Sequence, residues 1–428
     1  MGGYARTVGP PGGWRKVGRS GGSRASRLSP MPHEARTTDR RSGSPVIYLD
    51  HNATTPVARE VHDAMRTYLE DGFGNPSSAH AYGDVARAAV EGARAEVAEL
   101  LGCDPESVVF TASGTEADNL AIKGVALAHL GERDHLITTA VEHPAVLSAC
   151  RYLQLRFGYR VTVLPVDGFG VVDADEVRRA IEPGTALISV MHASNEVGTI
   201  QPIAEIARAA AERGIPLHTD AAQSVGKVAV NVDELGVDLL TVAGHKLYAP
   251  KGIGVLYVRP GTRIDPVIHG AGHEHGLRAG TENVPYIAGL GAAARLARRR
   301  LHDGADRGVE RMRDRLHAAL SSAVPGLALN GHPDNRLPNT LNVSFPGCDG
   351  ERLLAGAPSV AAATGSACHS GRTEPSAVLT AMGLDAGRAL GAVRLSLGYD
   401  TADPEIEAAA GALAAAAVAE RRRSTALV

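Results

Sequence analysis

The sequence predicts an α/β protein whose large domain is built around a mainly parallel sheet, followed by a smaller α+β domain. Near-continuous apolar runs recur between residues 107 and 258, which is typical of strands that helices cover on both faces. Segments with apolar residues three and four positions apart separate these runs. Because strands that alternate with helices favour a parallel sheet, this part of the chain is expected to form one large α/β domain.

The elements can be placed along the chain in order. The apolar runs read SVVFTA, HLITTA, RVTVLPV, TALISVMHA, IPLHTDAA, DLLTVAG and GIGVLYV. Helices are clearest at residues 116–130 and 202–214, and the second closes on Gly214, as a helix C-terminus should. Beyond residue 301 the pattern changes to a helix, two strands and an Ala-rich helix, at residues 309–323, 340–345, 392–398 and from Asp403.

Composition changes divide the chain into three parts. Residues 1–45 are rich in Gly, Ser, Pro and Arg and hold hardly an aliphatic side chain, so we expect a disordered tail. An Arg- and Ser-rich start can also be a transit peptide, although no amphipathic period is clear, and Met31 is an alternative start. We expect residues 46–60 and 304–428 to form the small α+β domain and residues 61–303 the large domain.

Composition also limits the function. With 44% hydrophobic and 21% charged residues the chain resembles a soluble globular protein, and no apolar stretch predicts a membrane span. A net charge of -3 gives no reason to expect nucleic acid as a partner. The four cysteines show no CxxC pairing, which favours reduced thiols and a cytoplasmic location over a disulfide framework or a zinc site.

Polar side chains follow two of the predicted strands. Lys246 comes after the run DLLTVAG, and the run IPLHTDAA delivers Asp220 with Gln223 three residues later. Open α/β sheets place their chemistry at such strand ends, and a carboxylate there suits the ring nitrogen of pyridoxal phosphate. Taken alone, the lysine could be a solvated residue and the aspartate could cap a helix.

A third strand end predicts an anion site. In FTASGTEADNLAIKG, a strand, a Gly/Thr turn and a helix follow one another, so Gly114 and Thr115 present N–H groups at a helix N-terminus. The segment has neither the lysine pattern of a P-loop nor the GxGxxG pattern of dinucleotide binding, which argues against a nucleotide enzyme. A phosphate turn, then an aspartate, then a lysine follow the order of pyridoxal-phosphate enzymes.

The resemblance becomes specific over most of residues 46–397. The segments VIYLDHNATTP, GNPSSAH, VEHPAVL, HASNEVGTI, TDAAQSVGK, GHKLYAPKGIGVLYVR, RAGTENVPYIAGLG and GSACHSGRTEPSAVL are similar to those of cysteine desulfurases of the NifS/IscS type, in the class-V pyridoxal-phosphate-dependent aminotransferase family. The resemblance implies a fold-type I pyridoxal-phosphate-dependent transferase with a mainly parallel seven-stranded sheet. It also implies conversion of L-cysteine to L-alanine and a homodimer.

The resemblance implies roles for individual residues. Lys246 would form the Schiff base, Asp220 would pair with the pyridine nitrogen, Gln223 would donate to the phenolic oxygen and His143 would stack on the ring and help to move protons. Gly114, Thr115 and His245 would hold the phosphate, joined by Thr281 from a second subunit. Asn195 and Arg394 would hold the substrate carboxylate, for which arginine offers a planar bidentate fork.

Cys368 would accept the sulfur as a persulfide and pass it to an acceptor protein, for iron–sulfur cluster assembly or another sulfur pathway. Its small neighbours, Gly365, Ser366, Ala367, Ser370 and Gly371, suggest a long movable loop, and transient cluster ligation by Cys368 is a further hypothesis. Cys348 has no motif around it and is interpreted as a plain thiol.

Some features leave alternatives open. A selenocysteine lyase shares the GTEN and ACHS segments, and a non-catalytic scaffold of the same fold or an aminotransferase would share most of the others. His269, His273 and His275 form a poor metal ligand set, so we expect a Gly-rich loop there, with Arg278 its other useful member. Ala243 and Tyr399 stand where many relatives have serine and arginine.

Overall fold

In the computed structural model of the chain, the described residues are 46–365, 367–369 and 372–426, with side chains described up to residue 365 and from 374 to 423. They all belong to one compact unit that runs from Thr38 to Val428. The predicted tail of residues 1–45 lies outside the described residues, as do Ser366, Ser370 and Gly371.

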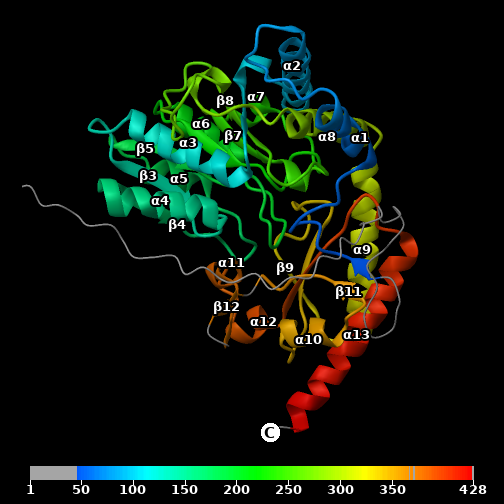
Figure 1. The fold of residues 1–428 in the computed structure, drawn as a ribbon. Helices are drawn as coiled ribbons and strands as arrows, with labels where there is room; N and C mark the ends of the chain where they lie inside the picture. The colour runs from blue at the N-terminus through cyan, green and yellow to red at the C-terminus, as the bar shows by residue number, and fades with distance from the viewer. Residues whose placement is uncertain (1–45, 366, 370–371, 427–428) are drawn as a thin grey trace, which may run out of the picture. The chain divides into compact units, whose positions relative to one another are not determined.

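All seven apolar runs form strands of one sheet (Figure 1). The strands are β2 (Val108–Thr111), β3 (His135–Thr139), β4 (Arg160–Leu164), β5 (Thr185–Ser189), β6 (Leu217–Asp220), β7 (Leu239–Ala243) and β8 (Gly254–Val258). Their order is β2-β8-β7-β6-β5-β3-β4. Strands β4, β3, β5, β6 and β7 pair in parallel, whereas β8 is antiparallel to both β7 and β2. The predicted mainly parallel seven-stranded sheet is confirmed.

Both faces of this sheet are buried, which explains the near-continuous apolar runs. Leu136 and Leu239 join the apolar cluster beneath α3 and α4, while the next residue along each strand, Ile137 and Leu240, joins the cluster on the opposite face. Successive side chains of a strand point to opposite faces, so a strand covered on both sides needs apolar residues at every position. The covering helices are α1 (Arg59–Glu70), α2 (Ala81–Leu101), α3 (Gly114–Ala128), α4 (Pro144–Phe157), α5 (Ala174–Ala180), α6 (Ile203–Ala211), α7 (Val232–Leu235) and α8 (Val284–His302).

One helix boundary differs from the prediction. The helix expected over residues 202–214 is α6, which ends at Ala211, and Gly214 follows in the turn with φ of 62°. Gly214 therefore has the left-handed backbone conformation that favours glycine, but it lies in the turn after the helix and is not the last helical residue.

The later part of the chain packs around its own apolar cluster, which Ile47 and Leu49 also join. Its central sheet is antiparallel in the order β14-β10-β9, from β9 (Ala328–Asn330), β10 (Thr340–Ser344) and β14 (Ala392–Ser396). Strand β1 (Ile47–Tyr48) pairs with β11 (Val360–Ala361). The helices are α9 (Ala305–Ala323), α10 (Gly350–Gly356), α11 (Ala377–Ala381), α12 (Ala386–Leu390) and α13 (Asp403–Ala426). The domain boundaries at residues 60 and 303 stay a prediction.

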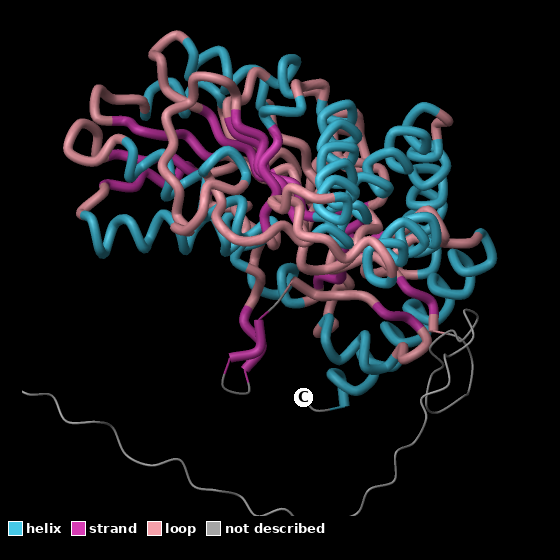
Figure 2. Tube along the Cα trace, turned by 45° about the horizontal axis from the view of Figure 1, so that its top comes forward, coloured by secondary structure: helices cyan, strands magenta, loops and turns pink. Residues whose placement is uncertain are grey.

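The segment with Cys368 differs from the expected loop. Strands β12 (Ala367–His369) and β13 (Arg372–Glu374) form a separate two-stranded antiparallel sheet in which Cys368 pairs with Thr373. Figure 2 shows this hairpin extending away from the other strands. The smallest residues lie beside and between the two strands in sequence, whereas the strand positions hold larger residues such as His369 and Thr373, which suit extended backbone.

Within the described part of the chain, no helix is both long enough and apolar enough to cross a membrane.

Candidate active site

The ends of β2, β6 and β7 open into one cavity of about 430 Å³. Its size lies in the range of ligand pockets, which is roughly 300–1,000 Å³. The predicted site residues that line it are Gly114, Thr115, His143, Asn195, Asp220, Gln223, His245, Lys246 and Arg394. The fold thus brings together, from segments far apart in sequence, nearly every residue that the sequence analysis singled out.

The phosphate turn is built by close packing of backbone. Ser113 caps α3, and its hydroxyl accepts from the Glu116 N–H at 3.1 Å. The N–H groups of Gly114 and Thr115 belong to the first helical turn, where no intrahelical acceptor exists. A side chain at Gly254 would place its Cβ 2.6 Å from the Ser113 carbonyl carbon, so only glycine lets β8 lie against this turn. The turn presents donors and the positive end of α3 to the cavity.

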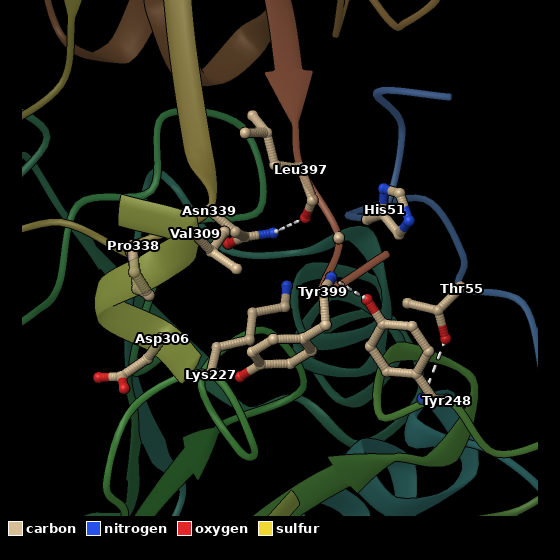
Figure 3. Close-up of a pocket in the computed structure, with 11 residues that line it drawn as sticks. His51, Thr55, Lys227, Tyr248, Asp306, Val309, Pro338, Asn339, Leu397 and Tyr399 are labelled. Atoms are coloured by element: carbon tan, nitrogen blue, oxygen red, sulfur yellow. Dashed lines mark hydrogen bonds between the residues drawn. The ribbon is translucent and has the colours of Figure 1, made fainter. Parts of the chain in front are cut away.

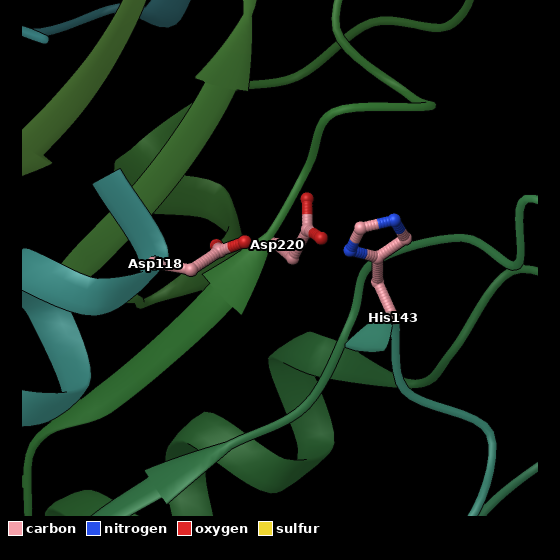
Figure 4. Close-up of side chains that lie close together, drawn as sticks. All are labelled: Asp118, His143 and Asp220. Atoms are coloured by element: carbon pink, nitrogen blue, oxygen red, sulfur yellow. The ribbon is translucent and has the colours of Figure 1, made fainter. Parts of the chain in front are cut away.

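Asp220 lies at the end of β6 and between Asp118 and His143 (Figure 4). One ligand atom from each of these three side chains lies within 4.8 Å of the other two. The Asp220 carboxylate also accepts from the Ala222 N–H at 2.9 Å, so it caps a turn and faces the cavity at the same time. Burial raises the pKa of Asp220, and nearby His143 and Lys246 oppose that rise.

Asp118 forms a second layer behind Asp220. Its side chain is buried, and its Oδ1 lies 3.6 Å from His218 Nε2 without a hydrogen-bond partner among the described residues. Burial and the charge of Asp220 raise the pKa of Asp118 well above its usual range, so the pair favours one shared negative charge. Such a carboxylate suits a positively charged ring nitrogen.

Lys246 lies in the short helix η2 (Gly244–Lys246) that follows β7. Its amino group donates to the carbonyl oxygens of Asn52 and, at 2.9 Å, of Ala53. Burial, and next the positive charge of Arg394, lower the pKa of Lys246 to about 8. Its amine is therefore uncharged in a much larger fraction of molecules at neutral pH than an exposed lysine, which favours attack on a carbonyl.

The two histidines of the cavity are neutral. His143 caps α4, and its Nδ1 accepts from the Ala145 N–H at 3.2 Å, which leaves the proton of a neutral ring on Nε2. The His143 side chain is exposed, but desolvation by the cavity residues around it lowers the pKa of His143, although Asp220 opposes the change. His245 Nδ1 lies 3.1 Å from Thr54 Oγ1, and burial lowers the pKa of His245 to about 4. His245 can thus hold a phosphate by hydrogen bonding rather than by charge.

Arg394 on β14 faces the cavity from the later part of the chain. It donates to the Asp50 carboxylate at 2.7 Å and to the Asn195 carbonyl oxygen at 3.1 Å. Its buried Nε has no hydrogen-bond partner among the described residues. A buried guanidinium with an unused donor is a fitting partner for a ligand carboxylate.

Both ends of the cysteine hairpin lie beside this arginine. The backbone of Ala363 pairs with that of Arg394, at 2.7 Å and 3.3 Å. Two residues further on, Gly365 has φ of 69°, and a Cβ there would lie 2.5 Å from Glu196 Oε2. At the other end, the Ser376 hydroxyl donates to the same Glu196 oxygen at 2.5 Å. Glu196 therefore binds one end of the segment that carries Cys368 through Ser376 and lies close to the other end at Gly365. The side chain of Cys368 lies outside the described residues.

Several of these residues were not predicted from the sequence. Asp118 follows Gly114 by four residues on a helix, which places it on the same face as the phosphate turn, and that spacing is a signal that could have found it. Glu196 directly follows Asn195. Asn52 has no such signal, because its contacts join segments that are distant in sequence.

The predicted Gly-rich loop is separate from the cavity wall. Thr281 is exposed and does not line the cavity within this chain, so its role across a dimer stays a prediction. Arg278 donates to Glu116 in the first turn of α3 at 2.8 Å. Among the described residues, the group with metal-binding geometry is Asp118, His143 and Asp220 rather than the loop histidines His269, His273 and His275.

Comparison with known proteins identifies the class of enzyme that this fold and cavity define. Residues 47–409 match the aminotransferase class-V family, and the chain belongs to it. The enzymes of this family depend on pyridoxal 5'-phosphate. The phosphate turn, the buried Asp220 and the low-pKa Lys246 fit the phosphate, the ring nitrogen and the aldehyde of that cofactor in turn.

The relatives within this family are cysteine desulfurases. The chain is 46% identical over 362 residues to the cysteine desulfurase IscS of Dictyoglomus turgidum, covering 84% of this chain and 91% of the relative. It is 41% identical to a cysteine desulfurase of Rattus norvegicus, over 90% of this chain and 86% of that protein.

Solved structures agree. A NifS-like protein superposes with a TM-score of 0.80 at 36% identity, covering 86% of this chain and 98% of its own. SspA in complex with cysteine superposes with a TM-score of 0.74 at 40% identity, covering 82% of this chain and 98% of its own.

Proposed function

We propose that the chain is a pyridoxal-phosphate-dependent cysteine desulfurase that converts L-cysteine to L-alanine and keeps the sulfur as a persulfide on Cys368. The observation that carries the proposal is the position of the hairpin's two ends. One end pairs with the backbone of Arg394 at Ala363, and the other binds Glu196 through Ser376, next in sequence to the Asn195 carbonyl that holds the Arg394 guanidinium. The cysteine segment is therefore attached next to the guanidinium that has a free donor for a substrate carboxylate. The cysteine desulfurase relatives support the same chemistry.

Substrate binding and orientation fall to Arg394 and Asn195. The guanidinium is held by Asp50 and by the Asn195 carbonyl oxygen, so its plane is fixed before the substrate arrives. Lys246 lines the same cavity, so a carboxylate bound to Arg394 keeps the rest of the amino acid within that cavity. Such fixed geometry lowers the entropic cost of reaching a reactive arrangement.

Lys246 and His143 handle protons. Bound pyridoxal phosphate supplies a ring that accepts the electron pair left when the Cα proton departs. Asp220 keeps a proton on the ring nitrogen, which its buried negative charge stabilises. The amine of Lys246, with its pKa near 8, takes the Cα proton and can return it, and the neutral His143 ring moves protons at the substrate sulfur.

The transfer of sulfur to Cys368 needs no added oxidant or reductant. The Cys368 thiolate attacks the substrate sulfur, the C–S bond breaks, and its electron pair stays on the substrate carbon, which then takes up a proton. L-cysteine and the Cys368 thiol become L-alanine and a Cys368 persulfide. The persulfide sulfur then passes to the thiol of an acceptor protein.

We also propose a sulfur acceptor, a dimer and a cellular location. The persulfide would serve an iron–sulfur scaffold or another sulfur acceptor, and Cys368 could ligate a cluster transiently during transfer. A homodimer would bring Thr281 of a second copy to the phosphate. A cytoplasmic location accords with the composition.

The test replaces Cys368 by serine and measures alanine release from L-cysteine. Turnover of selenocysteine is measured in a second, separate assay. The expected result is loss of at least about 100-fold of alanine release from cysteine, with the absorbance of bound cofactor unchanged. Cys103→Ser, which alters a half-buried thiol packed against an apolar cluster of the large sheet, is the matched control and keeps full activity. Full cysteine turnover by Cys368→Ser would refute the mechanism, and turnover of selenocysteine alone would make the enzyme a selenocysteine lyase.

A further inference from the structure

A second lysine lies close behind the cofactor cavity and has no part in the mechanism above. Lys227 is 7% exposed, and its amino group donates to Gln223 Oε1 at 2.7 Å and to Asn52 Oδ1 at 2.9 Å. Its side chain borders a small cavity of about 20 Å³, which admits one water molecule. Figure 3 shows it beside the ring of Tyr399, with its amino group pointing toward Asn339.

Asn52 connects this lysine to the catalytic residues. Its side-chain oxygen accepts from Lys227 and, at 3.0 Å, from Asn339. Its side-chain nitrogen donates to Thr340 at 2.8 Å and to the Asn195 carbonyl oxygen at 3.2 Å. All the hydrogen-bonding positions of this amide are used, so Asn52 has a single orientation.

Gln223 is held by the same network. Its Nε2 donates to the Asn52 carbonyl oxygen at 2.9 Å, and that carbonyl also accepts from Lys246. Its Oε1 accepts from Lys227. The hydrogen bond from Lys227 to Oε1 and the hydrogen bond from Nε2 to the Asn52 carbonyl oxygen together determine which end of the Gln223 amide is the oxygen.

We propose that Lys227 is a positioning residue that locks the Gln223 amide with its NH₂ group toward the cofactor. Without this lock the amide could rotate and present its oxygen to the phenolic oxygen of pyridoxal phosphate, where two acceptors would repel each other. The inference rests on the proposed role of Gln223 as a donor to that oxygen.

The surroundings of Lys227 change the pKa of its amino group. Burial, and then the positive charges of Lys246 and Arg394, lower the pKa of Lys227 well below its usual range. The other titratable groups that line its cavity have partners of their own or make no hydrogen bond with Lys227. His51 is bonded to Asp400, the Tyr248 hydroxyl accepts from the Tyr399 N–H, and the Tyr399 hydroxyl donates to the Gly226 carbonyl oxygen. Asp306 forms no hydrogen bond with Lys227. The amino group donates to two acceptors, Gln223 and Asn52, that the described residues supply.

The experiment measures cofactor binding and the pH midpoint of the visible absorbance change of bound pyridoxal phosphate. Lys227→Met is expected to weaken cofactor binding about tenfold and to raise the pH midpoint by about one unit, because a donor to the phenolic oxygen is lost. Lys227→Gln, which keeps a neutral donor on a shorter side chain, is expected to give a smaller shift. Lys123→Met, which removes a lysine over the Tyr152 ring, is the control and leaves both quantities unchanged.

A double-mutant cycle decides whether Lys227 acts through Gln223. Gln223→Leu alone is expected to match Lys227→Met, and the double variant is expected to add nothing further. Additive shifts would overturn the proposal, as would an unchanged midpoint in both Lys227 variants with only a lower melting temperature. Because both readouts concern the cofactor, they hold whether or not the chain desulfurates cysteine.

Discussion

The strand ends that carry Asp220 and Lys246 and the hairpin that carries Cys368 are attached to the protein in different ways. Strands β6 and β7 each have two neighbours in a seven-stranded sheet that is buried on both faces. Strands β12 and β13 pair with each other in a separate two-stranded sheet. The cofactor half of the site is thus built into the core, whereas the sulfur half is held at its ends by Ala363 and Glu196. The two halves should therefore respond differently to substitution.

The largest effect is expected from Lys246→Ala, because this substitution removes the lysine of the cofactor half of the site, which is built into the core. Loss of the base should lower alanine formation by about 10³-fold or more. The cysteine hairpin keeps its attachment, so the rate at which iodoacetamide alkylates Cys368 should stay within about twofold of the unsubstituted protein. A large change in that rate would show that the two halves are more tightly joined than the contacts indicate. Lys251→Ala, which removes a nearby exposed lysine, is the control.

A smaller effect is expected at the attachment of the hairpin. Ser376→Ala removes the hydroxyl that binds Glu196 and should slow persulfide formation on Cys368 about tenfold, the factor that corresponds to roughly 1.4 kcal/mol. Cofactor affinity and the affinity for L-alanine should not change, because Arg394 and Lys246 keep their partners. Single-turnover measurement of the persulfide separates these steps. Thr380→Ala, on the next helical turn after Ser376, serves as the control. Equal losses of persulfide formation and of ligand binding would contradict the separation.

The smallest effect is expected beneath the cofactor half, at Glu142. This buried carboxyl accepts from Thr139 at 2.7 Å and from the Met191 N–H at 2.9 Å, and its other oxygen has no partner among the described residues. Burial raises the pKa of Glu142 to about 8. Between pH 5 and 8 the folded protein therefore holds a proton that the unfolded chain releases, so the free energy of unfolding falls as pH rises.

Glu142→Gln should remove that pH dependence. Since a neutral amide replaces the protonated carboxyl, the loss of about 2 kcal/mol expected between pH 6 and pH 8 should disappear. Denaturant unfolding at several pH values measures it, with Glu70→Gln on the exposed face of α1 as the control. An unchanged slope in Glu142→Gln would mean that Glu142 is already ionised at pH 6.

Much of the fold followed from local patterns. The seven apolar runs form the seven strands because a strand buried on both faces must be apolar at every position. This pattern involves consecutive residues, so it can be recognised from the sequence. Gly114, Asp220 and Lys246 were found for a related reason, since each follows such a run. The hairpin at Cys368 was predicted as a loop, because its small flanking residues say little about pairing between two three-residue segments.

The tertiary structure determined contacts that no local sequence pattern predicts. Asn52 meets Gln223, Lys227 and Lys246, and Glu196 meets Ser376, through contacts between segments more than a hundred residues apart. Tyr399, a departure from the pattern of many relatives, donates to the Gly226 carbonyl oxygen at 2.8 Å and so joins the later part of the chain to the turn that ends at Lys227. The sequence alone determined the strands and the residues at their ends, because strand periodicity is local. The partners that tune those residues, from the shifted pKa of Lys246 to the orientation of Gln223, depend on burial and on distant contacts, which exist only after the chain has folded.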